Sequence, residues 1–178
     1  MNTLKSKKMP FFIILAVIII IICAINYGFG IGLAEYTVAA VFAAFFAVED
    51  IETMHISSTM LLVMLGVSIV VVGVSFDTEL YISSAVSGGV MFVVLMVMHF
   101  ITMRGLGMGD VKLVSIVSFL IGFTDAMQLM FTTLILTVVV GIVICIIKKG
   151  SLKSELPMIP GFMAAMLINN LIILAARR

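Results

Sequence analysis

Two aspartates stand beside apolar runs that otherwise contain almost no charge. Asp50 follows the run V-A-A-V-F-A-A-F-F-A-V-E, and Asp110 lies within R-G-L-G-M-G-D-V-K-L at residues 104–113. An acidic residue in or beside a membrane span is costly to keep ionised, so each is a candidate for function. If the two carboxylates meet, they share a proton, and one can activate a water while the other protonates a substrate carbonyl. This pair predicts peptide-bond hydrolysis without a metal or a covalent intermediate.

Other catalytic groups are poorly represented in the sequence. Cys23 and Cys145 lie in separate apolar runs, with no C-x-x-C motif and no histidine at ligand spacing. Neither a zinc site nor a disulfide is therefore expected. We find no Cys-His pair and no suitably placed Ser-His or Ser-Lys arrangement. The sequence thus predicts no metal and no cofactor.

Three glycines, Gly105, Gly107 and Gly109, precede Asp110. Backbone without side chains would let an extended peptide lie against the chain beside the carboxylate. The alternative is a glycine-rich turn in which Asp110 caps a helix, since an aspartate in the first turn also matches the positive end of the helix dipole. Both interpretations remain open at this point.

The elements that must position these residues are membrane helices. Of the 178 residues, 63% are hydrophobic and 11% are charged, which is far from the composition of soluble domains. The net charge of +1 and the lack of a basic stripe give no indication of nucleic-acid binding. A membrane helix needs about 20 mostly apolar residues. The stretches that approach this length are Pro10 to Gly30, Leu33 to Ile51, Thr59 to Phe76, Leu80 to Met103, Met108 to Phe123, Met127 to Ile147 and Ile159 to Ala176.

The basic residues predict the orientation, because short cytoplasmic loops collect lysine and arginine. The first apolar stretch is longer than the core of a signal peptide, about 7–15 residues, so we expect it to be an uncleaved helix. With the N-terminus inside, the expected outer loops contain no lysine or arginine, and only Arg177 and Arg178 depart from the pattern. Asp50 and Asp110 are then predicted at the same cytoplasmic face. The basic residues predicted inside are Lys5, Lys7, Lys8, Arg104, Lys112, Lys148, Lys149 and Lys153.

Small residues recur at helical spacing on two of these stretches. Ala39, Ala43 and Ala47 lead to Asp50, and Ser84 and Gly88 form a second small-x-x-x-small pair. Narrow faces of this kind let neighbouring helices approach closely, so we interpret both as packing surfaces. Of the other polar residues, Glu49, Glu52 and His55 are expected at a solvated interface, and His99 is expected to be a hydrogen-bonded packing residue.

The segment G-M-G-D-V-K-L at residues 107–113 resembles the GxGD motif of the type IV prepilin peptidases. These are membrane aspartic proteases and include the archaeal preflagellin peptidases. D-I-E-T-M-H-I at 50–56 resembles the other aspartate segment of the family, with Ser57 where a proline is usual. P-M-I-P-G-F at 157–162 resembles the Ile-Pro entry into the last helix, although Gly161 and Phe162 replace the usual Phe-Gly-Pro continuation.

The resemblance implies an all-α, polytopic transmembrane bundle, with a six-helix GxGD catalytic core at 33–178 and an extra helix within 1–32. Asp50 and Asp110 would be the catalytic pair, with Gly107, Gly109 and Lys112 beside the substrate. Lys112 could equally be a basic anchor that snorkels to the interface. The implied reaction removes the short basic leader of a prepilin-like or pseudopilin precursor, commonly after a glycine, at the cytoplasmic face of the cytoplasmic (inner) membrane. Larger members carry paired C-x-x-C motifs and methylate the new N-terminus; this sequence has no such segment, so we predict a peptidase alone.

Two other classes of protein could use the same aspartates. An ion-coupled transporter or channel component would pass protons or cations through Asp50 and Asp110 and would show internal repeats with interrupted helices, and we find no convincing repeat. In a non-enzymatic membrane subunit the carboxylates would be anchors only. The sequence gives no indication of the oligomeric state.

Overall fold

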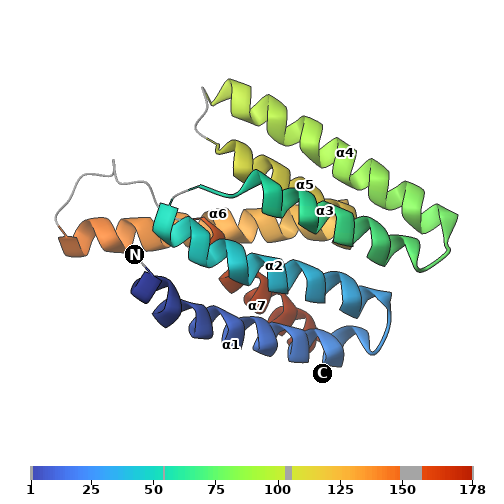
Figure 1. The fold of residues 1–178 in the computed structure, drawn as a ribbon, viewed down its shortest axis with the longest axis horizontal. Coiled ribbons are helices and arrows are strands. Elements are labelled where there is room, and N and C mark those ends of the chain that lie inside the picture. Colours follow the sequence, from blue (N-terminus) through green and yellow to red (C-terminus); the bar gives the residue numbers. More distant parts are fainter. Residues whose placement is uncertain (1, 54, 103–105, 149–157, 178) are drawn as a thin grey trace.

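The computed structural model shows a bundle of helices (Figure 1). The structure describes residues 2–53, 55–102, 106–148 and 158–177, without the side chains of 2–8, 144, 145, 147 and 148. Predictions for Arg104, Gly105, Lys149, Lys153 and Arg178 therefore lie outside the described residues, as do those for the side chains of Cys145, Lys148 and the N-terminal lysines.

Each predicted apolar stretch corresponds to one helix, and the described residues contain no strand, so the predicted all-α class is confirmed. The main differences lie at the ends of the stretches. The first helix begins well before Pro10, and the fifth and sixth are separated only by Gly122, whose φ of 87° lets the chain turn sharply. The helices are α1 Asn2–Tyr27, α2 Ile31–Thr53, α3 Ser58–Gly73, α4 Thr78–Ile101, α5 Met108–Ile121, α6 Phe123–Lys148 and α7 Ile159–Ala176.

The bundle has the surface of a multi-pass membrane protein. Among the described residues, 5 helices are long and apolar enough to cross a bilayer, namely α1, α2, α4, α6 and α7, and α3 is a shorter apolar helix. Large apolar side chains such as Ile25, Leu62, Phe100 and Ile135 are exposed on these helices. Apolar surface of this extent is typical of a lipid-facing protein.

Helix α5 lies at the centre of the bundle. It contacts α2, α3, α4 and α6, and apart from Lys112 every residue from Val111 to Leu120 is buried. With 14 residues, α5 has the length that favours a core helix rather than one exposed to lipid. The burial of 111–120 therefore fixes the position of the first turn of α5, which carries Asp110.

Small residues allow close packing between the helices, as predicted. Ala39, Ala43 and Ala47 of α2 are fully buried. On α4, a Cβ added to Gly88 would lie 2.9 Å from Cβ of Phe119 and 3.2 Å from the carbonyl oxygen of Ser115, both on α5. Nothing larger than glycine fits at this crossing, so the backbones of α4 and α5 are in near contact there.

The N-terminal helix α1 packs against α2 and α7. Its buried Asn26 donates from Nδ2 to the backbone oxygen of Asn170 at 2.8 Å, and the Cys23 thiol donates to Oδ1 of Asn170 at 3.3 Å. Such hydrogen bonds between apolar helices fix their register in a membrane. Helix α1 is thus attached on the side of the bundle away from α4 and α5 (Figure 1).

Successive helices run in opposite directions. The C-terminal ends of α2, α4 and α6 and the start of α5 lie at one end of the bundle, whereas the C-terminus lies at the other (Figure 1). The end of α2 carries Asp50 and the start of α5 carries Asp110. The two aspartates therefore lie at the same end, and Arg177 lies at the opposite end.

Candidate active site

A cavity of about 410 Å³ opens at the end of the bundle where α2 finishes and α5 begins. Both aspartates line it, so segments 60 residues apart in the sequence contribute to one site. We call it the aspartate cavity. Its walls are Asp50, His55, Ile56, Ser58, Gly107, Met108, Gly109, Asp110 and Lys112.

Asp50 is held by the first turn of α7. Its side chain is buried, and Oδ2 accepts a hydrogen bond from the backbone N–H of Ile159 at 3.0 Å. The first N–H groups of a helix have no partner within the helix, and they lie at the positive end of its dipole. Pro160 follows in the same turn, where a proline is well tolerated. The carboxylate therefore receives a partner that is itself part of the backbone and does not titrate.

Asp110 lies in the first turn of α5 and is half-buried. Gly107 is the N-cap residue of this helix, and a Cβ added to it would lie only 2.9 Å from Oδ2 of Asp110. The carboxylate thus folds back over the residue that precedes its own helix, as a side chain at the third helical position does in a capping box. Gly107 leaves the space that this conformation needs.

Gly109 provides space for a different neighbour. A Cβ at this position would lie 3.0 Å from Cδ1, 3.1 Å from Cβ and 3.3 Å from Cγ1 of Ile56, which belongs to the connection between α2 and α3. The glycine thus lets that connection pack directly on the first turn of α5. Because Asp50 lies just before the connection, this contact brings the two aspartates toward one another.

Polar contacts outside the cavity support the two segments that carry it. Oε2 of Glu49 accepts from the backbone N–H of Ser57 at 3.1 Å and thereby folds the connection between α2 and α3. On the other side, Nδ1 of the buried His99 lies 2.5 Å from the carbonyl oxygen of Leu106 and holds the segment before Gly107. The prediction of a hydrogen-bonded packing role for His99 is confirmed.

The structure brings the predicted site residues together. Asp50, Asp110, Gly107, Gly109 and Lys112 all line the aspartate cavity, and so does the exposed His55. Substrate contact by the glycines and Lys112 remains a prediction, since the space beside both glycines is already filled by groups of the protein.

Sequence reasoning missed the groups that position the aspartates. The backbone N–H of Ile159 and the side chain of Ile56 have no chemistry that a pattern could reveal. The only available signal was the Ile-Pro pair at 159–160, which is typical of a helix start but does not identify what that start contacts.

The arrangement offers two carboxylates facing one space at the end of a membrane bundle. In the described part of the chain, no group of three or more acidic, histidine or cysteine side chains could hold a metal ion. The polar side chains that line the cavity and could act on a bound molecule are the two carboxylates, His55, Ser58 and Lys112.

The fold and the site define the class: a multi-pass helical membrane protein with paired acidic side chains in one cavity. The chain belongs to the type IV leader peptidase family, whose sequence model matches residues 37–146 and so includes both aspartates. This match confirms the resemblance seen at 107–113, and membership implies a peptidase, that is, a hydrolase. The match ends before the segment at 157–162. No curated protein and no solved structure matches the chain significantly.

Proposed function

We propose that the protein is a membrane aspartic endopeptidase that removes the leader of type IV prepilin-like or pseudopilin precursors at the cytoplasmic face of the cytoplasmic membrane. The observation that carries the proposal is that Asp50 and Asp110 line one cavity at the end of the bundle. The family match supports leader peptides as the substrate class. In this proposal residues 33–178 are the catalytic core and α1 is an addition to it.

The two carboxylates have different surroundings, which suggests a division of roles. A hydrogen bond from the backbone N–H of Ile159 stabilises the ionised form of Asp50, so we assign the base to Asp50 and the acid to Asp110. Asp50 takes a proton from a water, the water oxygen attacks the scissile carbonyl carbon, and Asp110 gives its proton to the carbonyl oxygen. The tetrahedral diol then collapses: the carbon–nitrogen bond breaks, the proton on Asp50 passes to the leaving amine, and a diol proton returns to Asp110.

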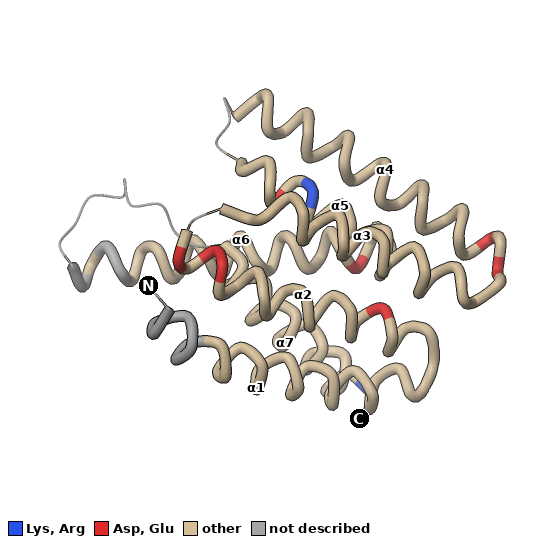
Figure 2. Tube along the Cα trace, viewed as in Figure 1, with Lys and Arg blue, Asp and Glu red and all other residues tan. Residues whose placement is uncertain are grey.

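Charge at the mouth of the site is consistent with a basic leader. Acidic side chains gather at the C-terminal end of α2, where Glu49, Asp50 and Glu52 occur within four residues (Figure 2). Lysine or arginine side chains in a leader would be attracted to this end of α2. Neither cysteine of the sequence lies in a C-x-x-C motif, and we therefore propose leader cleavage without methyl transfer.

Cleavage of a purified precursor tests the proposal. The protein in detergent is mixed with a prepilin-like precursor, and loss of the leader is followed by gel shift. We expect Asp50→Asn and Asp110→Asn each to lower the rate by about 10²–10⁴-fold, the usual contribution of a general acid or base. Asp77→Asn is the matched control, because Asp77 caps α4 far from the cavity and asparagine caps a helix equally well. Wild-type rates in either of the first two variants would contradict the two-carboxylate mechanism.

A further inference from the structure

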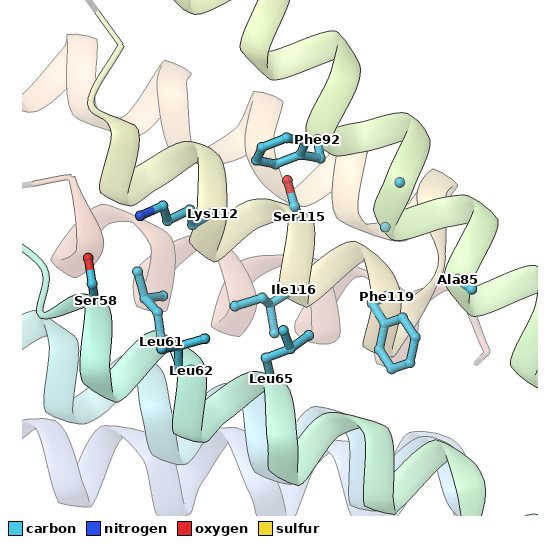
Figure 3. Close-up of a pocket in the computed structure, with 12 residues that line it drawn as sticks. Ser58, Leu61, Leu62, Leu65, Ala85, Phe92, Lys112, Ser115, Ile116 and Phe119 are labelled. Carbon is cyan, nitrogen blue, oxygen red and sulfur yellow. The ribbon is translucent and has the colours of Figure 1, made fainter.

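A second cavity, of about 480 Å³, lies beside the aspartate cavity among α3, α4 and α5 (Figure 3). Its lining is apolar apart from two serines and one lysine, and we call it the apolar groove. Each of the three helices contributes four residues with the same spacing of i, i+3, i+4 and i+7. They are Ser58, Leu61, Leu62 and Leu65 of α3, Ala85, Gly88, Gly89 and Phe92 of α4, and Lys112, Ser115, Ile116 and Phe119 of α5.

This spacing gives the groove a definite shape. Residues at i, i+3, i+4 and i+7 form one face of a helix, so three such faces line an open groove that runs along the helices. From Lys112 to Phe119 the apolar groove extends over two helical turns, about 10 Å. On α4, Ala85 and Gly89 are small and exposed and nothing lies within 4 Å of a Cβ added to Gly89, so the backbone of another helix could approach closely there.

The apolar groove is continuous with the aspartate cavity. Ser58 and Lys112 line both spaces, and they lie at one end of the groove, whereas Ala85 and Phe119 lie toward the other (Figure 3). A chain cut beside the aspartates can therefore continue directly into the groove. Since α4 is long enough to span a bilayer, a chain following the groove passes from the cytoplasmic end toward the membrane interior.

We propose that the apolar groove binds the segment of the precursor that follows the scissile bond, as an apolar helix; this inference rests on the proposed function. A backbone in the bilayer must satisfy its own hydrogen bonds, so a segment in this groove is helical. The side chains of the bound segment are expected to be apolar because the residues that line the groove are mostly apolar. The ammonium group of Lys112 at the mouth repels a basic leader, which leaves the acidic end of α2 for the leader and the groove for the segment after the cut.

Gly89 permits a direct test. A Cβ added to Gly89 meets nothing within 4 Å, so this position accepts a side chain, and Gly89→Leu places a large apolar group in the groove. Gly66 of α3 is an equally open, exposed glycine that does not line the groove, and Gly66→Leu is the matched control. Two substrates are compared: the full precursor, and a short soluble peptide that contains the leader and the scissile bond without the apolar segment.

We expect Gly89→Leu to raise KM for the full precursor by about tenfold or more, with kcat little changed. The short peptide should be cut equally by wild type, Gly89→Leu and Gly66→Leu, which also reports that all three are folded. Equal KM values of the two variants for the full precursor would overturn the groove proposal and leave the proposed function standing. Failure of the wild type to cut either substrate would overturn both.

A second measurement does not depend on kinetics. A photoreactive side chain at Phe92, in an otherwise unchanged protein, should cross-link to precursor residues on the C-terminal side of the scissile bond. Cross-links only to lipid, or only to a second copy of the chain, would assign the groove to those occupants and overturn the proposal.

Discussion

Replacing Gly109 by alanine distinguishes two reasons for the glycine beside Asp110. If the glycine exists to admit substrate, alanine should impair only catalysis. If it exists to let Ile56 pack on α5, alanine should also disturb the fold. The added Cβ would lie 3.0–3.3 Å from three carbons of Ile56, whereas carbon atoms prefer about 3.5–4.0 Å. Ile56 and its connection must therefore move away by about half an ångström.

The magnitudes follow from that displacement. Overpacking of this kind costs about 1–3 kcal/mol, partly offset by about 0.5–1 kcal/mol from replacing glycine in a helix. We expect a net loss of about 1 kcal/mol in the free energy of unfolding. A misplacement of about 1 Å can cost 10²-fold in rate. A displacement of about half an ångström therefore predicts roughly tenfold slower leader cleavage.

A double-mutant cycle provides the assay. Ile56→Ala removes Cδ1 and Cγ1, two of the three close atoms, so it should restore much of the activity and thermal stability that Gly109→Ala loses. Thermal unfolding in detergent and precursor cleavage are measured for both single variants and the double variant. Gly66→Ala, where a Cβ meets open space, should be at least as stable as wild type. If the double variant is no better than Gly109→Ala alone, the packing explanation fails and substrate contact is favoured.

Variants at Gly107, at Gly88 with Gly89 as its control, and at His99 test three other contacts. Gly107→Ala should slow cleavage strongly with little effect on unfolding, because its Cβ meets only the movable carboxylate of Asp110 at 2.9 Å; wild-type rates would contradict this. Gly88→Ala should lower the melting temperature by overpacking α4 on α5, whereas Gly89→Ala should not, and equal melting temperatures would count against the close crossing. His99→Ala should lower the free energy of unfolding by about 1–3 kcal/mol and slow cleavage, because the hydrogen bond to Leu106 is lost. His99→Asn retains a donor near the position of Nδ1 and should recover part of both. If it recovers neither, the loss of this hydrogen bond does not explain the effect of His99→Ala.

The helices and the shared end of the two aspartates could be predicted from the sequence because both depend on one-dimensional signals. The length of each apolar stretch predicts a helix, and the presence of basic residues in alternate loops predicts that Asp50 and Asp110 lie at the same end. The central position of α5 could not be predicted so directly. Its sequence is as apolar as that of a lipid-facing helix, and only its length of 14 residues hints that it is enclosed.

The apolar groove illustrates the same limit. In a soluble helix, polar residues mark the face that points away from the core. In α3 and α4 most residues are apolar on the lipid-facing, core-facing and groove-facing sides alike, so no periodicity separates Leu62, which lines the groove, from Val63, which is exposed beside it. The faces become distinct only when the neighbouring helices are in place.

The same reasoning explains how two acidic groups can stand together in an apolar bundle. Acidic residues at membrane depth need partners, and an ion pair with a lysine would occupy carboxylate oxygens that have to exchange protons. Here the stabilising partners come from helix starts: Asp50 accepts from the first N–H of α7, and Asp110 lies in the first turn of α5. Partial charges of the backbone favour an anion without donating a proton to it. Both carboxylates thereby keep an oxygen for a water and a substrate, which is the condition that the proposed chemistry requires.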